Sequence, residues 1–342
     1  MKKGVCPICG IENNCGMLKG IEHTDCWCTK VQFDKELFEF VPEVYNGVSC
    51  VCINCVNQFK KSRAVKKMYD LHLHTTASDG TTTPEEVAEM VLRKGMKGFA
   101  ITDHDTIDGI KAGKEKAQEL GLDFIPGIEF SSSLEGKDVH ILGYYINTED
   151  ERFLEILRKI NLKRDERNHK IIENLKKYKI NLTMEELKKE AKGNIVSKLH
   201  MANVLVNKGL VYTKEEAFKS YLGKNGVAYE GHGSFTPYRA VEILVENGAF
   251  VSLAHPNVYS KNINEVEKLI IELKEKGLKG IEVQYPSYTK EQRNQYLELA
   301  KKYDLVITGG SDFHGKNRSN IEIGQEGISY SQMLYLKEKL NK

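Results

Sequence analysis

The sequence predicts an α/β protein of strand–helix units, preceded by a small cysteine-rich module. From Met68 onward, short apolar runs alternate with amphipathic helical stretches, a pattern typical of parallel strands joined by helices. Ionisable side chains follow the apolar runs, at the strand ends where parallel-stranded barrels carry their chemistry. All eight cysteines lie between Cys6 and Cys55, which sets the first part of the chain apart from the rest.

Length and composition agree with such an organisation. The 342 residues suffice for two domains, or for one large α/β domain with an appendage. Hydrophobic residues make up 40% and charged residues 29%, as in ordinary globular proteins. The net charge of +2 is too small to attract the whole protein electrostatically to nucleic acid or to a membrane. Because no run of about 18 apolar residues and no signal-peptide-like segment occur, we expect a soluble, cytoplasmic protein without a membrane partner.

We divide the chain into a cysteine module at 1–60, a basic linker at 61–67 and an α/β domain at 68–342. A helix is expected from Pro84, with Gly95 after its end. Further helices are expected at 107–121, 263–277 and 289–303, and extended segments at 68–75, 98–105, 123–133, 138–146, 249–256, 280–285 and 305–315. Residues from about 150 to 235 carry Lys, Glu, Leu and Ile at helical spacing, which indicates a helical insertion.

Histidines and carboxylates gather at the ends of the expected strands. In the stretch Asp-Leu-His-Leu-His, strand geometry sends His72 and His74 to the same face. Four other strand ends carry Asp103 and His104, Glu129, His255, and Asp312 and His314. Each residue alone could be a turn, a helix cap or a hydrogen-bonded side chain. Together they would be costly to bury unless paired, and divalent Zn, Mn or Fe suits imidazole combined with carboxylate.

Six motifs in order resemble the polymerase and histidinol phosphatase (PHP) superfamily. They are H-x-H-T-x-x-S-D-G, T-D-H-D, P-G-I-E-F-S, H-I-L-G-Y, L-A-H-P and G-S-D-F-H-G. The resemblance extends from about residue 68 to the C-terminus. It is greatest to stand-alone phosphoesterases of nucleotides and short oligonucleotides, which carry a helical insertion at the same place. It implies a distorted seven-stranded (β/α) barrel with two to three divalent metal ions.

The resemblance also implies which residues hold the ions of such a trinuclear site. The first ion would be held by His72, His74, Glu129 and Asp312, the second by Glu129, His140 and His255, and the third by Asp79, His104 and His314. No ligand position of the family is replaced, which disfavours a degenerate, non-catalytic copy.

The expected chemistry is hydrolysis of a phosphate ester. Two close cations lower the pKa of a shared water, so that a metal-bridging hydroxide attacks phosphorus without a Ser or Cys nucleophile. We nominate His314 or Asp312 to protonate the leaving group. The expected activity is that of a 5′-3′ exonuclease or a 3′,5′-bisphosphate nucleotide phosphatase. The alternatives are a phosphatase of a small molecule such as histidinol phosphate, and a non-catalytic nucleic-acid-binding regulator.

Phosphate-binding residues are expected in the helical insertion. Arg164 and Arg167 share one helix face and match phosphate oxygens, although a solvated surface is the commoner fate of such charges. Residues 197–202 resemble the family's R-P-H-x-A segment, in which His200 matches and Lys198 stands where Arg is usual. A helix-start residue without a ligand is the alternative for His200.

The cysteine module is expected to hold zinc. C-x-x-C followed by C-x-C-x-x-C is a strong metal signal, and eight thiolates fill two tetrahedral sites. The candidate ligands are Cys6, Cys9, Cys15, Cys26, Cys28, Cys50, Cys52 and Cys55. The pattern resembles the cysteine-rich CWC family over about residues 5–58, which implies no activity. A zinc-ribbon-like structural role is the default for so small a core, with an iron–sulfur cluster as the alternative. A further hypothesis is that the module and basic residues 60–67 help to hold nucleic acid.

Overall fold

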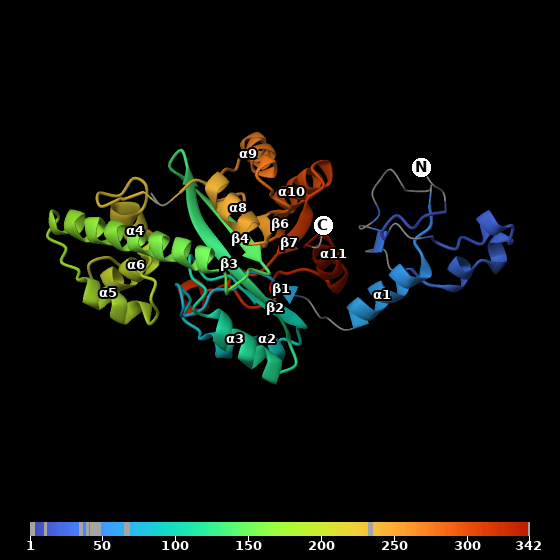
Figure 1. The fold of residues 1–342 in the computed structure, drawn as a ribbon, viewed down its shortest axis with the longest axis horizontal. Helices are drawn as coiled ribbons and strands as arrows, with labels where there is room; N and C mark the ends of the chain where they lie inside the picture. The colour runs from blue at the N-terminus through green and yellow to red at the C-terminus, as the bar shows by residue number, and fades with distance from the viewer. Residues whose placement is uncertain are drawn as a thin grey trace. The chain divides into compact units, whose positions relative to one another are not determined.

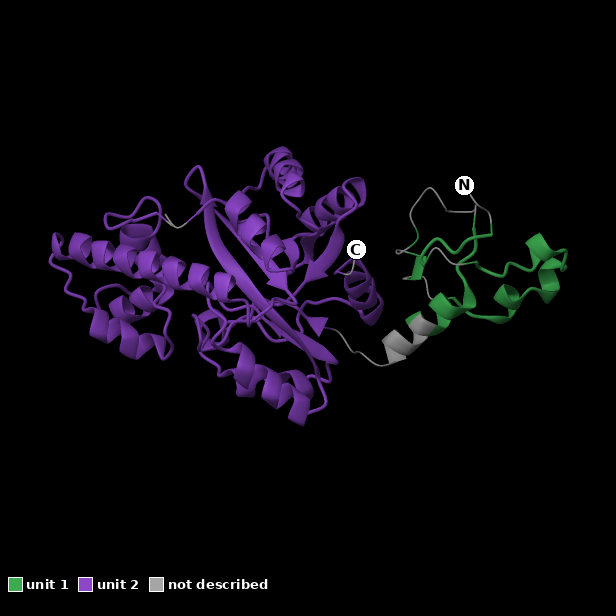
Figure 2. Ribbon diagram, in the orientation of Figure 1, with its two compact units in different colours: residues 1–67 green, residues 68–342 purple. Residues whose placement is uncertain are grey.

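The computed structural model describes residues 4–9, 12–33, 37–38, 41, 49–64, 69–231 and 235–340. The chain forms two compact units, residues 1–67 and 68–342 (Figure 2). In the first unit, the short 3-10 helices η1 (Met17–Lys19), η2 (His23–Asp25) and η3 (Trp27–Lys30) precede the helix α1 (Ile53–Ala64). Residues 61–64, which the sequence analysis placed in a linker, are the last turn of α1. Lys, Arg and Ala favour helices, and neither Gly nor Pro ends the helix earlier.

Seven strands of the second unit form one sheet, in the sequential order β1 to β7 (Figure 1). They are β1 (Tyr69–Asp70), β2 (Gly98–Ile101), β3 (Asp123–Leu134), β4 (Lys137–Tyr144), β5 (Phe250–Leu253), β6 (Gly280–Gln284) and β7 (Val306–Gly309). The residues after β1 meet those after β7, because His74 N donates to Phe313 O and Asp312 N donates to His72 O. The sheet is thus a nearly closed barrel, and the expected fold class is confirmed.

Strand β4 departs from the expected parallel arrangement, because it runs antiparallel to both β3 and β5. Only Glu135 and Gly136 connect β3 to β4, both with positive φ, and two such residues make a hairpin turn. A parallel connection would need a crossover of a dozen or more residues, which this segment lacks. The hairpin pairs His140 with Ser131, and so brings a fourth-strand histidine close to Glu129 in β3.

Helices cover the outside of the barrel (Figure 1). They are α2 (Pro84–Arg93), α3 (Ile110–Glu119), α8 (Pro237–Glu246), α9 (Ile263–Glu275), α10 (Lys290–Lys302) and α11 (Tyr330–Leu340). Helix α2 begins with a capping box between Thr83 and Glu86, and Pro84 takes the first helical position. None of the helices among the described residues has the length and apolar character needed to span a bilayer.

The helical insertion lies between β4 and α8. It comprises α4 (Glu151–Lys176), α5 (Met184–Ala191), α6 (Lys198–Asn207), α7 (Lys214–Ala217) and the π-helical turn η6 (Phe218–Leu222). Helix α4 runs from the barrel into the insertion (Figure 1) and contributes to two cores. Phe153 and Leu157 pack in the barrel core, whereas Ile171 and Leu175 pack in the core of the insertion. One continuous helix therefore fixes the insertion relative to the barrel.

Candidate metal centre

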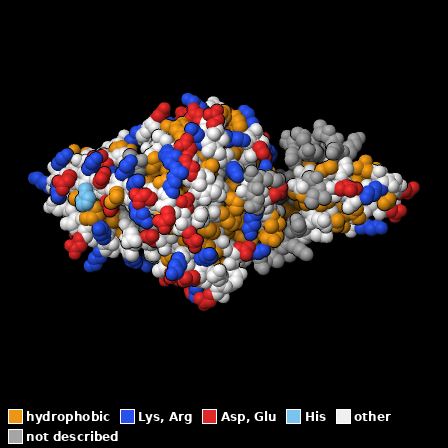
Figure 3. Space-filling model, viewed as in Figure 1, with side chains coloured by type: hydrophobic (Ala, Val, Ile, Leu, Met, Phe, Trp, Pro, Cys, Tyr) orange, Lys and Arg blue, Asp and Glu red, His pale blue; other side chains and the backbone are white. Residues whose placement is uncertain are grey.

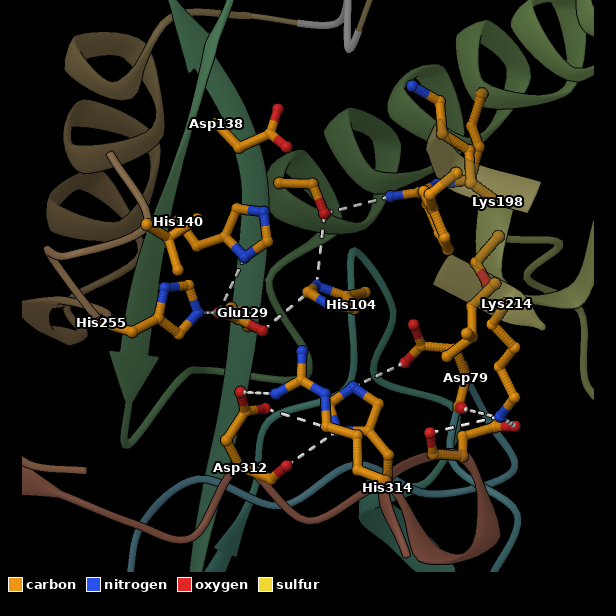
Figure 4. Close-up of a pocket in the computed structure, with 18 of the residues that line it drawn as sticks. Asp79, His104, Glu129, Asp138, His140, Lys198, Lys214, His255, Asp312 and His314 are labelled. Carbon is orange, nitrogen blue, oxygen red and sulfur yellow. Dashed lines mark hydrogen bonds and ion pairs between the residues drawn. The ribbon is translucent and has the colours of Figure 1, made fainter. Parts of the chain in front are cut away.

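Nine histidine and carboxylate side chains converge at one end of the barrel, and Figure 4 shows those of them that also line a pocket. They are His72, His74, Asp79, His104, Glu129, His140, His255, Asp312 and His314, the nine candidate metal ligands of the sequence analysis. Within several groups of three or four, the donor atoms all lie within 4.8 Å of one another. One such group contains His74, Asp79, His104 and His314.

Glu129 lies at the centre of this cluster and is fully buried. Five imidazole nitrogens lie 2.9–3.3 Å from its two carboxylate oxygens; they belong to His72, His74, His104, His140 and His255. Burial alone would raise the pKa of Glu129, but the surrounding imidazoles hold it well below its usual range. The carboxylate is therefore ionised and serves as an acceptor.

Several buried donor atoms of the cluster have no hydrogen-bond partner among the described residues. They are His72 Nε2, His74 Nδ1 and Nε2, His255 Nδ1 and Glu129 Oε2. His74 Nε2 lies 3.2 Å from Glu129 Oε2 and 3.3 Å from Asp312 Oδ1, yet forms no hydrogen bond with either. Buried polar atoms normally have partners, and a cation accepts lone pairs from imidazole and carboxylate alike. The donor set therefore fits divalent transition-metal ions.

Glu282, a buried acid that the sequence analysis did not select, contacts the ring of His72 and the backbone of His255. It lies in β6 and is fully buried. Its Oε1 lies 3.0 Å from His72 Nδ1, and its Oε2 accepts a hydrogen bond of 2.8 Å from His255 N. Such carboxylates fix the tautomer and ring orientation of metal-binding histidines. The available signal was an acid inside an otherwise apolar strand, Gly-Ile-Glu-Val-Gln.

Two buried aspartates outside the candidate set hold the backbone around the cluster. Asp103 accepts hydrogen bonds of 2.7 Å from Thr75 N and Thr75 Oγ1, and one of 2.6 Å from Ser78 Oγ. Asp70 accepts from Ser311 N at 2.9 Å, and burial raises its pKa to about 6. These contacts fasten the loop after β1 and the loop after β7, which carry five of the nine donors between them.

Asp312 and His314, the two candidate acids, are both arranged as ligands. Asp312 Oδ2 accepts a hydrogen bond of 2.7 Å from Tyr285 Oη and is also bound by Arg318. Burial would raise the pKa of Asp312, but Arg318 helps to hold it well below its usual range. His314 Nδ1 lies 2.9 Å from the Asp312 backbone oxygen, a contact that fits an Nδ1–H donor and leaves Nε2 as a lone pair.

A cavity of about 500 Å³ lies over the donor cluster, with Arg164, Arg167 and Lys198 of the insertion in its wall. Arg164 is only 8% exposed, forms an ion pair with Asp105 and donates to Ser131 Oγ at 3.3 Å. Burial lowers the pKa of Arg164 to about 9 and that of Arg167 to about 10. Both guanidinium groups are protonated at neutral pH.

Lys198 stands at the start of α6, in the same cavity wall (Figure 4). Its ammonium nitrogen lies 4.4 Å from the centre of the Tyr229 ring, within the range of a cation–π contact. Burial, and next the charge of Arg167, lower the pKa of Lys198 to about 8. Lys198 is therefore a cation whose charge changes close to physiological pH.

His200 does not line this cavity, unlike the other three candidate substrate-binding residues. Its Nδ1 accepts a hydrogen bond of 3.1 Å from Ser197 N, and its own N–H donates back to Ser197 Oγ. The two residues form the capping box that begins α6. These contacts fit the alternative given for His200 in the sequence analysis, a residue that begins a helix.

The cysteines of the first unit lie in two groups. Cys6, Cys9, Cys52 and Cys55 place their sulfur atoms within 4.8 Å of one another. In the other group, Cys26 Sγ and Cys28 Sγ lie 3.2 Å apart. Burial, and next the nearby Cys15 thiol, raise the pKa of Cys50 to about 11. The outer cysteines of the sequence thus form the first group, and the inner cysteines gather separately.

Comparisons with known proteins agree with this geometry. The family model of the PHP domain matches residues 70–233, and that of the cysteine-rich CWC family matches residues 6–57. The chain is 35% identical to a 5′-3′ exoribonuclease of Haemophilus influenzae, over 72% of this chain and 90% of that protein. It is 28% identical to a 3′,5′-nucleoside bisphosphate phosphatase of Chromobacterium violaceum, over 75% of this chain and 90% of that protein.

A solved structure shows the same fold. A protein of Bifidobacterium adolescentis, assigned as a metal-dependent phosphoesterase, superposes with a TM-score of 0.72 at 27% identity. The match covers 79% of this chain and 95% of that one. The barrel, its donor cluster and the sequence matches lead to one conclusion: the chain belongs to the PHP family.

Proposed function

We propose that the chain is a metal-dependent phosphoesterase that acts on nucleotides or short oligonucleotides. The proposal depends on one observation, a cavity with seven of the nine metal-type donors on one side and cationic side chains of the insertion on the other. These cations include Arg164, Arg167 and Lys198. A phosphate group suits both sides, because its oxygens bind divalent ions and also accept hydrogen bonds from guanidinium and ammonium groups.

We infer that the donors hold two to three ions of Mn, Zn or Fe. His72, His74, Glu129 and Asp312 would hold the first, Glu129, His140 and His255 the second, and Asp79, His104 and His314 the third. When bound, these ions supply a water nucleophile of lowered pKa and offset the charge on the phosphate oxygens. Glu282 sets the ring orientation of His72 through the 3.0 Å contact. The cysteines of the first unit would hold zinc.

The three cationic residues would have different roles in substrate binding. Arg167 and Lys198 would bind the phosphate oxygens directly. Arg164 is already paired with Asp105 and bonded to Ser131, whose hydroxyl lies 3.2 Å from His104 Nδ1. We therefore assign Arg164 mainly to positioning the loop that carries His104.

The ligand geometry also bears on the leaving group. Asp312 accepts hydrogen bonds, and the proton of His314 faces a backbone carbonyl. We therefore propose that both residues act as metal ligands and not as general acids for the leaving group.

Two of the relatives favour a nucleotide substrate over other phosphate esters. One is named for cleaving RNA from the 5′ end and another for hydrolysing a nucleoside bisphosphate. Both activities concern a phosphate beside a second phosphate on a nucleoside. A histidinol-type substrate is the second candidate, and a non-catalytic regulator is the third.

A substrate panel tests the proposal. The full-length protein is assayed with Mn, Zn and Fe on a nucleoside monophosphate, a 3′,5′-bisphosphate, a 5′-phosphorylated oligonucleotide and histidinol phosphate. We expect turnover of the nucleotides and a loss of at least about 100-fold in His74→Ala and Asp312→Ala. The matched control is His169→Ala, which removes an exposed imidazole of α4 and should leave turnover unchanged. Wild-type turnover in both ligand variants would contradict the proposal, and a preference for histidinol phosphate would favour the second candidate.

A further inference from the structure

A second cavity, of about 380 Å³, adjoins the metal cavity, and Lys214 and Asn317 line both of them. The floor of the second cavity includes Gly80 and Thr81, which directly follow the candidate ligand Asp79. Its walls come from α5, α6 and the turn after β7. A substrate held at the donor cluster could therefore extend into this second space without leaving the surface of the protein.

Asn317 builds the boundary between the two cavities. Its Nδ2 donates to the backbone oxygen of Asp79 at 2.8 Å. Its Oδ1 accepts from Lys214 Nζ at 3.0 Å and from Asn203 Nδ2 at 3.1 Å. These contacts hold the ammonium group of Lys214 in the lining that the two cavities share.

Positively charged side chains predominate around the second cavity. Lys189, Lys192 and Lys316 line it, and none of them has a carboxylate within 4.0 Å among the described residues. Lys208, also in the insertion, does pair with a carboxylate, at 2.6 Å from Glu186.

The described lining of the second cavity contains little negative charge. Glu190 is the one acid among the described residues that line the second cavity, and it accepts a hydrogen bond of 2.9 Å from Asn203. Basic and acidic side chains are interspersed over the face of the barrel unit that Figure 3 shows. What distinguishes Lys189, Lys192 and Lys316 is that they gather around one cavity, where their charges suit an anion.

We propose that the second cavity binds a second phosphate, one nucleoside away from the phosphate held at the donor cluster. This inference rests on the proposed function. The second phosphate could be the other phosphate of a nucleoside bisphosphate or the next phosphodiester of an oligonucleotide. Lysines suit this role because an ammonium group binds phosphate as a point charge and tolerates either geometry. A volume of about 380 Å³ also leaves room for the sugar that carries the phosphate.

Steady-state kinetics of the full-length protein test the inference on three substrates. They are a nucleoside 5′-monophosphate, a nucleoside 3′,5′-bisphosphate and a 5′-phosphorylated trinucleotide. The variant is Lys189→Ala/Lys192→Ala, because these residues of the insertion line the second cavity alone. KM for the substrates with a second phosphate should rise about tenfold or more, as expected when a charged hydrogen bond is lost, with kcat unchanged. KM for the monophosphate should not change.

Two controls separate charge from folding. Lys189→Arg/Lys192→Arg keeps both charges and should restore the wild-type KM. Lys268→Ala removes an exposed lysine of α9, on the outside of the barrel, and should leave all three substrates unaffected. The slope of log KM against log salt concentration for the trinucleotide should also become shallower in the alanine variant, by about 0.7 for one lost phosphate contact.

The outcomes distinguish the two sources of the phosphate. A rise in KM for both the bisphosphate and the trinucleotide means that any second phosphate is bound, and a rise for the trinucleotide alone means that a continuing strand is bound. The inference is overturned if the alanine variant matches Lys268→Ala on both substrates, or if the wild type hydrolyses monophosphates only, which leaves the phosphoesterase function standing. A wild type that hydrolyses no phosphate ester with any metal contradicts the proposed function itself.

Discussion

At the scale of single residues, Glu129 depends on its neighbours more than any other side chain. A fully buried carboxylate is costly, and here five imidazoles surround it. Imidazole hydrogen bonds satisfy Oε1, through His140 and His255, but leave Oε2 without one. The lone pairs of Oε2 would therefore be available to a bound metal ion, which suits Glu129 to a metal-ligand role.

Glu282→Gln tests the role of the buried acid behind this cluster. The amide keeps the shape of the side chain but removes the charge that faces His72 Nδ1. Loss of such an outer partner typically weakens metal binding by about 10- to 100-fold. We expect activity to fall at limiting metal and to recover when metal is added in excess, in a titration of the apoprotein with Mn.

The matched control for this substitution is Glu298→Gln, at an exposed ion pair of α10. It should leave the titration midpoint unchanged. An unchanged midpoint in Glu282→Gln as well would mean that His72 does not need Glu282 for metal binding.

Lys198 gives the substrate affinity a specific dependence on pH. Its pKa is lowered to about 8, so the side chain is charged below that pH and neutral above it. KM for a nucleotide should therefore rise about tenfold between pH 7 and pH 9, as the ammonium group loses its proton. In Lys198→Arg the charge persists over this range, so the rise should disappear. Parallel KM profiles for the two proteins would exclude Lys198 from phosphate binding.

At the scale of elements, the apolar runs and their polar ends predicted the order of strands and helices. The direction of β4 and the role of Glu282 could not be predicted from the sequence. The antiparallel course of β4 follows from a two-residue turn, whereas an apolar run by itself carries no direction. Glu282 was missed because an acid in a strand is ordinarily the solvent-facing member of an alternating pattern. His200 matched a motif, and the sequence did not show that its Nδ1 accepts the Ser197 N–H or that it lines the second cavity instead of the metal cavity.

Helix α4 is held on the barrel by the buried pair of Arg164 and Asp105. In Arg164→Met the carboxylate would remain buried without its cation, which typically costs about 3–5 kcal/mol in the free energy of unfolding. Urea unfolding followed by far-UV circular dichroism measures this loss. Tryptophan fluorescence would not, because the only tryptophan is Trp27 in the first unit.

Two comparison variants show whether the unpaired charge of Asp105 causes the loss of stability in Arg164→Met. Arg164→Met/Asp105→Asn removes both charges and should recover much of the lost stability. Arg158→Met breaks an exposed pair with Glu155 on the same helix and should cost less than about 1 kcal/mol. Equal losses in Arg158→Met and Arg164→Met would contradict the assignment of Arg164 as a positioning residue.

At the scale of the whole molecule, the chain combines two units with different sources of stability. The barrel unit has large apolar cores, which include fully buried residues such as Phe130, Phe250 and Ile281. The described core of the first unit is small and contains three of its cysteines, Cys6, Cys52 and Cys55. So small a core normally needs a metal or disulfides to fold, and no comparable need exists in the barrel unit. Loss of the thiol ligands should therefore affect the first unit alone.

Cys6→Ser in the full-length protein tests this independence. The substitution removes one sulfur from the group of Cys6, Cys9, Cys52 and Cys55. We expect the bound zinc to fall by one equivalent, measured by elemental analysis of protein loaded with Mn at the barrel site. Because Trp27 packs against the core of the first unit, its fluorescence should shift at a lower urea concentration than in the wild type. Met17→Ser, at an exposed residue of the same unit, is the control.

Hydrolysis by Cys6→Ser then separates a structural module from a substrate-holding one. Turnover of a nucleoside bisphosphate should stay at the wild-type level, because all nine barrel donors lie in the other unit. If the module helps to hold nucleic acid, KM for a long 5′-phosphorylated oligonucleotide should rise while the bisphosphate is unaffected. An equal fall for both substrates would show that the two units are not independent, and unchanged kinetics for both would limit the module to a role outside substrate binding.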